Sequence, residues 1–234
     1  MSPTKVQLES KQKKLIDAVR QGRIETVRHY LKVGSIDVNW RDKDDRYGGC
    51  SALHHACTQD LPQIVELLIH EFKADINLPS LENRLTPLMV AITFGNISSA
   101  IRLLQHGANV NIQSKGGWTP LHVACEGCIG YNANYDGYDL DPSAVKFLVE
   151  TLLAHGADPS IENEDGDSPL CFAKQNENFH AIIDVLTRYQ DKTQEGKEMN
   201  QKPSEVLKDL KTQVTECISK IVSSSERQKG RFEN

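Results

Sequence analysis

Apolar residues recur along the chain in short blocks with helical spacing. Each block contains an apolar run opened by Thr-Pro or a related dipeptide, followed by a second stretch with apolar residues along one helical face. The alanine of the first run falls at positions 18, 56, 91, 124 and 173. A spacing near 33 residues, widened by insertions, predicts a stacked array of repeats.

The best-preserved copy of the first run extends from Trp118 to Cys125, and diverged copies begin at Ser51, Thr86 and Ser168. A hydroxyl at the start of a helix caps free backbone amides, and proline suits the first helical position. Helices this short are not stable in isolation and need neighbours on both sides. The pattern therefore predicts pairs of short helices that stabilise one another by stacking.

The second helix of a block ends in a turn with glycine, as in the segment from His106 through Gly107 to Asn111. Together with Thr119-Pro120-Leu121-His122, this segment resembles the ankyrin-repeat family over roughly residues 10–189. The resemblance implies an all-α fold, an α-solenoid of about five stacked repeats with short β-hairpin fingers. Apolar residues spaced 3-4-3-4 from Leu207 to Ile221 predict an additional C-terminal helix. Departures from the family pattern are Phe72-Lys73-Ala74 for Gly-Ala, Arg84 for the hairpin glycine, and Pro159-Ser160 for Val-Asn.

The predicted domain boundaries follow from this pattern. An ankyrin-repeat domain spans residues 1–189, with units near 10–45, 46–80, 81–113, 114–162 and 163–189 and an insertion at 127–142. A polar linker (190–202), a C-terminal helix (203–222) and a disordered tail (223–234) complete the chain. Two roles remain open for the C-terminal helix: packing on the last repeat, or docking to a partner or a second copy. The residues Asp42–Asp45 lengthen the first finger.

Composition and motifs argue against catalysis and bound cofactors. The net charge of −5 gives no reason to expect nucleic acid or an anionic membrane as a partner, and no apolar run is long enough to span a bilayer. Cysteines without a secretory signal indicate a cytoplasmic or nuclear protein. His122, Cys125 and Cys128 have zinc-like spacing, but His122 and Cys125 take the same repeat positions as His54 and Cys57, and a structural zinc site needs four ligands. We expect no enzyme activity, no cofactor and no metal.

The resemblance implies a non-catalytic module that binds another protein, as an adaptor, inhibitor or assembly factor. In the family, the hairpin tips and the ends of the first helices line the concave binding surface, and a histidine at the position of His54 and His122 braces the hairpin backbone. The candidate partner-binding residues carried over to this chain, together with the tyrosines of the insertion, are Arg41, Tyr47, Glu82, Leu85, Phe94, Gln113, Lys115, Trp118, Glu126, Tyr131, Tyr135, Tyr138, Glu164, Asp165 and Asp167.

Several alternatives remain open for this surface. Trp118 is either an exposed partner contact or packs against the neighbouring finger, and the tyrosine-rich insertion is either a contact or a solvated loop. The acidic far end suits a basic segment of a partner. The resemblance also makes Asn77 and Asn111 candidate acceptors for hydroxylation. The alternative function is an obligate subunit of a larger complex, assembled through the C-terminal helix; without self-association of that helix we expect a monomer.

Overall fold

The structure is a computed structural model that describes residues 5–33, 36–43, 48–126, 141–198, 212, 214–216 and 218–219. The chain forms two compact units, Met1–Thr119 (unit 1) and Pro120–Asn234 (unit 2). Unit 1 contains the helices α1 (Lys5–Arg20), α2 (Ile24–Val33), α3 (Ala52–Thr58), α4 (Pro62–His70), α5 (Pro87–Thr93) and α6 (Ile97–Gln105). Unit 2 contains α7 (Pro120–Cys125), α8 (Pro142–Ala154), α9 (Pro169–Gln175) and α10 (His180–Glu198).

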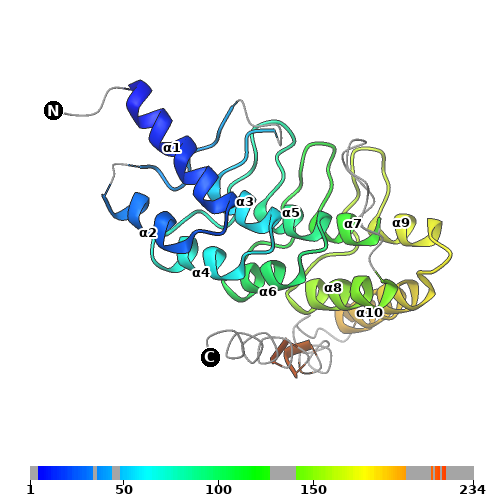
Figure 1. Cartoon of the computed structure of the whole chain (residues 1–234). Coiled ribbons are helices and arrows are strands. Elements are labelled where there is room, and N and C mark those ends of the chain that lie inside the picture. The colour runs from blue at the N-terminus through cyan, green and yellow to red at the C-terminus, as the bar shows by residue number, and fades with distance from the viewer. Residues whose placement is uncertain are drawn as a thin grey trace. The chain divides into compact units, whose positions relative to one another are not determined.

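The helices of unit 1 form consecutive antiparallel pairs that stack on one another (Figure 1). The first helices contact each other in the order α1, α3, α5, and the second helices in the order α2, α4, α6. Ala18, Ala56 and Ala91 lie in the interface between first helices and are buried. A methyl side chain at these positions lets neighbouring helix backbones approach closely, which explains the alanine spacing in the sequence.

Unit 2 repeats this arrangement with two helix pairs. α7 packs against α8 and α9, and α10 packs against α8 and α9. Ala124 and Ala173 are fully buried, as Ala56 and Ala91 are in unit 1. The all-α repeat fold predicted from the sequence is therefore confirmed.

Two features of unit 2 bear on the C-terminal segment. α10 continues to Glu198 and so runs through most of the segment for which the sequence predicts a linker. Residues 212, 214–216 and 218–219 are helical, and the side chains of Val214 and Ile218 are buried. Because both apolar side chains are buried within the single chain, their burial favours packing of this segment on its own chain.

The helices begin as the sequence predicts. The hydroxyl oxygen of Thr86 accepts a hydrogen bond from the amide of Met89 (3.3 Å), and Pro87 takes the first helical position of α5. At α3 the amide of Ser51 donates to Nδ1 of His54 (3.2 Å). Both arrangements satisfy backbone donors that a helix start would otherwise leave without partners.

The fingers differ from the expected β-hairpins. Within the described ranges no strand is present, and the one β-bridge joins Arg41 and Ser51. The finger at 80–85 is closed by a backbone bond from Ser80 to Leu85 (2.9 Å), and the finger at 114–118 by one from Ser114 to Trp118 (2.8 Å). The arms are too short to continue either ladder, so each finger is a turn closed by a single backbone bond.

The two departures from family glycine positions keep the expected backbone shape. Lys73 and Arg84 each adopt a φ of +55°, the left-handed region that glycine normally occupies. A non-glycine residue there costs free energy, which the surrounding helices and fingers must offset. The Asp42–Asp45 insertion lies partly outside the described residues.

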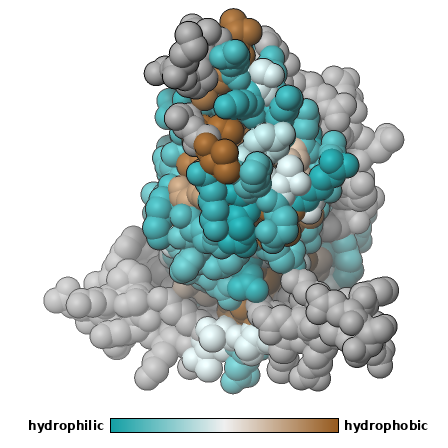
Figure 2. All heavy atoms as spheres, turned by 60° about the vertical axis from the view of Figure 1, so that its left-hand side comes forward, coloured by the Kyte–Doolittle hydropathy of each residue, from teal (hydrophilic) through white to brown (hydrophobic). Residues whose placement is uncertain are grey.

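The described surface on one side of the molecule is mostly polar. Figure 2 turns the α1–α2 side of unit 1 forward and shows a mainly hydrophilic face interrupted by hydrophobic groups in its upper part. The large apolar side chains exposed within the described part of the chain are Val6, Val33 and Leu81. No helix in that part is both long and apolar enough to cross a membrane.

Candidate functional site

The fingers of unit 1 are joined to each other by backbone hydrogen bonds. The amides of Leu81 and Glu82 donate to the carbonyls of Gly49 (3.2 Å) and Gly48 (3.0 Å), and the amide of Lys115 donates to the carbonyl of Asn83 (2.9 Å). These bonds connect each finger to its neighbour, so the tips form a continuous backbone row. Side chains on this row are consequently held on a preorganised support.

Two histidines support the finger backbones through hydrogen bonds, as the family resemblance implies. Nε2 of His54 lies 2.9 Å from the carbonyl oxygen of Leu85, and Nε2 of His122 lies 3.0 Å from that of Asp167. Because the carbonyl can only accept, Nε2 carries the proton in each ring. Burial lowers the pKa of His122, which favours the neutral ring that this contact requires. The predicted structural role of these histidines is confirmed.

Three candidate residues of unit 1 have bonds that support the fingers themselves. Arg41 is partly buried and donates to the carbonyl of Pro79 (2.8 Å). Gln113 donates from its side-chain amide to the carbonyl of Gly117 (2.8 Å), within its own finger. Leu85 contributes the carbonyl that His54 contacts. These residues fix the shape of the surface.

The remaining described candidates of unit 1 present their side chains more openly. Glu82 and Lys115 are exposed at finger tips, and Phe94 and Trp118 are partly exposed. Trp118 closes its finger through its backbone carbonyl, whereas Phe94 follows the last residue of α5. This set combines aromatic side chains with opposite charges, the residue types that dominate binding energy at protein interfaces.

The finger of unit 2 spans 163–167 and is organised by Asn163. Its Oδ1 accepts the amides of Asp165 (2.9 Å) and Asp167 (2.9 Å), while its buried Nδ2 has no hydrogen-bond partner among the described residues. The carboxylates of Glu164 and Asp165 are exposed, and Asp167 is partly exposed. These three acidic candidates therefore lie on one tight turn, which gives this finger a local negative charge.

Glu126 occupies a different setting, at the end of α7. Its amide donates to the carbonyl of His122 (2.9 Å), and its side chain is half-buried. Burial raises the pKa of the Glu126 carboxyl to about 7. The group therefore changes charge near neutral pH, which ordinary glutamates do not.

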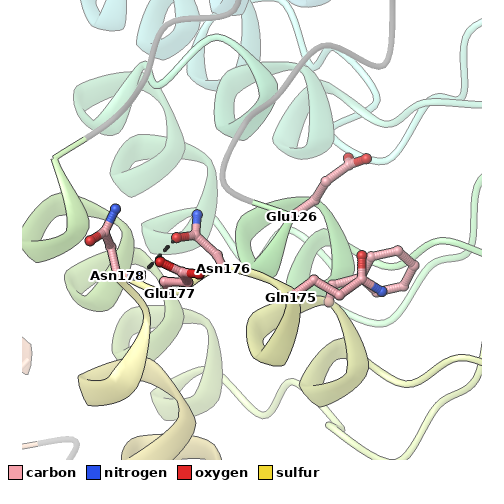
Figure 3. Close-up of a pocket in the computed structure, with 6 residues that line it drawn as sticks. Glu126, Gln175, Asn176, Glu177 and Asn178 are labelled. Carbon is pink, nitrogen blue, oxygen red and sulfur yellow. Dashed lines mark hydrogen bonds between the residues drawn. The ribbon is translucent and has the colours of Figure 1, made fainter.

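Glu126 lines a cleft of about 590 Å³ together with Phe172, Gln175, Asn176, Glu177 and Asn178. In Figure 3, Glu126 approaches from the end of α7, Gln175 from α9, and the last three residues from the loop that follows α9. The rings of Phe172 and His122 form a T-shaped contact, with the ring centroids 6.0 Å apart. The sequence indicated Glu126 but missed the other five residues, because they belong to a different repeat.

The other candidates divide into two groups. Tyr47, Tyr131, Tyr135 and Tyr138 lie outside the described residues. Asn77 is partly buried, and its Oδ1 accepts the amide of Asn109 (2.9 Å), so its amide group is engaged in the scaffold. The amide of Asn111 donates to Oδ1 of Asn109 (2.9 Å). Hydroxylation of either asparagine stays a prediction.

The cysteines behave as small apolar residues. Cys57 and Cys125 are completely buried, and burial raises the pKa of both thiols well above the ordinary range. A thiol held in its neutral form is a poor nucleophile and a poor metal ligand. Across the described ranges, no group of three or more His, Cys, Asp or Glu side chains is placed to hold a metal ion.

Comparison with known proteins identifies the family. A family model described as "Ankyrin repeats (3 copies)" matches residues 73–133, and one described as "Ankyrin repeat" matches 48–81 and 116–164. Relatives include the B-cell lymphoma 3 protein homolog of Mus musculus, 31% identical over 74% of this chain and 33% of its own length. A putative ankyrin repeat protein of Fowlpox virus is 31% identical over 88% of this chain and 59% of its own length.

A third relative, protein phosphatase 1 regulatory subunit 27 of Homo sapiens, is 34% identical over 36% of this chain and 45% of its own length. The chain thus spans between about a third and three fifths of the length of these relatives. The two family models together cover residues 48–164, half of the chain. With its buried alanines, braced fingers and paired helices, the chain belongs to the ankyrin-repeat family.

Proposed function

We propose that this chain is a non-catalytic protein-interaction module that acts as an adaptor, inhibitor or assembly factor. The partner protein binds the unit 1 binding surface, which we define as Arg41, Glu82, Leu85, Phe94, Gln113, Lys115 and Trp118. The observation that carries the proposal is the partial exposure of Phe94 and Trp118 on a repeat scaffold whose fingers are bonded to one another. Aromatic anchors on a rigid support supply binding energy at a low cost in conformational entropy.

The residues of this surface have two different roles. Arg41, Leu85 and Gln113 hold the finger backbones, so they shape the surface. Phe94, Lys115 and Trp118 supply apolar area and charge to the partner. One relative is named as a regulatory subunit of a protein phosphatase, which supports a role in binding another protein.

The acidic finger of unit 2 extends the proposal to the partner's chemistry. Glu164, Asp165 and Asp167 favour a basic segment, because opposite charge speeds association and orients the partner. The proposed location is the cytoplasm or the nucleus. The four described cysteines are free thiols, which fits such a reducing compartment.

Site-specific photo-crosslinking in cells tests this function. A photoreactive amino acid at position 115, on a finger tip, is expected to give a discrete covalent adduct with a protein partner. The same group at the exposed position 70, at the end of α4, serves as the matched control and is expected to give none. Trp118→Ala should reduce the position 115 adduct about tenfold, as expected for loss of a hot spot.

The surface variant Lys115→Glu provides a second measurement, because an exposed side chain leaves folding intact. It should reduce crosslinking from position 82 while the thermal unfolding midpoint stays unchanged. Equal crosslinking from positions 70 and 115, or normal partner capture by both variants, would contradict the proposed surface.

A further inference from the structure

One position of the repeat controls how each first helix ends. The residue four places after the repeat alanine is Gly22, Asp60 or Gly95 in unit 1, with φ of +66°, +47° and +66°. Because this residue is left-handed, the chain reverses direction after the helix, and the amide of the following residue donates to the carbonyl of the repeat alanine. The bond runs from Asn96 to Ala91 at the end of α5 (2.8 Å), and α1 and α3 end in the same way.

This turn places a side chain between neighbouring repeats. Nδ2 of Asn96 donates to the carbonyl of Cys57 (2.6 Å) and to that of Thr58 (3.0 Å). These two carbonyls lie at the end of α3, where the last carbonyls of a helix have no amide partner in a following turn. The junction between α3 and α5 is therefore closed by a protein donor.

Unit 2 departs from this arrangement at the corresponding place. Glu177 takes the position of Gly95 but has no positive φ. Asn176 is extended instead, with φ −105° and ψ 114°, and the amide of Asn178 donates to Oδ1 of Asn176 (3.0 Å). Asn178 is the counterpart of Asn96, and its side chain is exposed. Within the described residues, its side-chain amide donates to no carbonyl of α7.

The result is the cleft between the ends of α7 and α9 (Figure 3). Glu126 occupies the repeat position that Thr58 occupies at the closed junction. The hydroxyl of Thr58 donates to the carbonyl of His54 (3.0 Å), whereas the carboxyl group of Glu126 lines the cleft. Glu177 adds a second carboxylate, and Phe172 adds an aromatic ring. The position that the Asn96 donor fills in unit 1 is thus replaced by a space whose lining includes two carboxyl groups, beside the side-chain amides of Gln175, Asn176 and Asn178.

We propose that this cleft binds an arginine side chain of the partner protein. This inference rests on the proposed protein-binding function and names one anchor of the basic segment. A guanidinium has five N–H donors in a fixed plane, which suits a cleft whose lining includes two carboxyl groups, and its face stacks on aromatic rings. A volume of about 590 Å³ holds the side chain with part of its flanking backbone.

Proton release accompanies arginine binding. The Glu126 carboxyl, with its pKa raised to about 7 by burial, must be ionised to pair with a cation. The other titratable or charged groups on the surrounding elements are Glu177 in the loop, His122 on α7, Lys174 on α9, and the Lys146–Glu150 pair on α8. Affinity should therefore rise as pH increases from 6 to 8, by roughly tenfold for a group that titrates near 7.

A peptide titration of the full chain tests the inference. The probe is acetyl-Gly-Arg-Gly-amide, followed by backbone amide NMR of the ¹⁵N-labelled protein at pH 8. Its uncharged isostere, with citrulline in place of arginine, is the ligand control. We expect saturable shifts at Glu126 and residues 172–178 with arginine, and affinity at least about tenfold weaker with citrulline.

Two variants assign the effect to Glu126. Glu126→Gln keeps the side-chain volume and should weaken arginine binding about tenfold and abolish its dependence on pH between 6 and 8. Asp184→Asn removes the same charge from an exposed position on α10 and should leave affinity unchanged. Native-like spectra of both variants exclude loss of folding.

The outcomes separate this inference from the proposed function. Equal binding of arginine and citrulline peptides, shifts away from the cleft, or wild-type affinity in Glu126→Gln would overturn the arginine site. If crosslinking from position 115 persists in that case, the protein-binding function stands without this anchor.

Discussion

At the junction between α3 and α5, the amide of Asn96 donates to two carbonyl oxygens at the end of α3. At the junction between α7 and α9, the corresponding Asn178 is exposed, and the space is an open cleft lined by Glu126. Both junctions are built from a first helix, a short turn and a buried alanine. They differ in whether the turn contains a left-handed residue.

Equivalent positions at the two junctions therefore have different surroundings: one position closes the stack of helices, and the other lines a cleft. A left-handed turn aims an asparagine at the preceding helix and stabilises the stack. Replacement of the left-handed residue by Glu177, with the turn extended at Asn176, withdraws that asparagine and leaves a cavity. This cleft is the proposed site for an external donor.

The largest expected effect comes from the bridging asparagine. Asn96→Ala removes two hydrogen bonds to carbonyls at the end of α3, of which that of Cys57 also accepts the amide of Asp60 (3.4 Å), so it should lower the free energy of unfolding by about 2 kcal/mol. Asn178→Ala should change it by less than about 0.5 kcal/mol, because its side chain is exposed. Urea unfolding measures both. Similar losses for the two variants would mean that the junctions are equally closed.

A smaller effect is expected from the turn residue itself. Gly95→Ala places a β-carbon at a φ of +66° and should destabilise the protein by about 1.5 kcal/mol. Glu177→Ala, at the equivalent position without a positive φ, should be neutral within about 0.5 kcal/mol. Chemical denaturation of the pair tests whether backbone conformation distinguishes the two turns. An unchanged stability of Gly95→Ala would mean that the left-handed conformation does not distinguish the two turns.

The smallest effect concerns the titration of Glu126, which replaces the non-titrating Thr58. Its folded pKa of about 7 lies above the ordinary value of 4.5, so the folded state retains a proton that the unfolded chain has released. The contribution of Glu126 to stability therefore falls as pH rises from about 4.5 to 7. Glu126→Gln should be more stable than the wild type at pH 8 by up to about 1 kcal/mol, a value reduced for partial solvent exposure.

Unfolding curves at pH 4.5 and pH 8 check this prediction. At pH 4.5 the variant and the wild type should differ far less than at pH 8, because the folded wild type then carries a neutral carboxyl group and the unfolded chain is only half ionised. Asp184→Asn serves as the control for a general change in net charge. A difference between Glu126→Gln and the wild type that is equal at both pH values would contradict a raised pKa.

Much of the scaffold was predictable because each repeat position has one local physical requirement. Alanine spacing located the interfaces between first helices, and the Thr-Pro motif located the helix starts. The roles of His54 and His122 followed from the same repeat position and are confirmed by their carbonyl contacts. The β-hairpin expectation was wrong within the described residues, because finger arms that form one closing bond are too short for a ladder.

The candidate site was only partly predictable. Glu126 was one of the candidates carried over from the family pattern, but its partners in the cleft lie in α9 and the loop that follows it, some fifty residues later. One signal was available: Glu177 occupies the position where other repeats have Gly22, Asp60 and Gly95. Reading that signal requires knowledge that the position is left-handed, which only the backbone angles supply.

The sequence by itself determined that this chain is a helical ankyrin array, because periodic alanines, prolines and glycines act through short-range sterics and local hydrogen bonds. It did not determine which junction is open. That depends on the direction of Asn96 and Asn178 across a gap to another repeat, and on the burial that raises the pKa of Glu126. Distances between repeats and exclusion of water arise only when the helices stack, so the tertiary structure alone decided where scaffold gives way to a cleft.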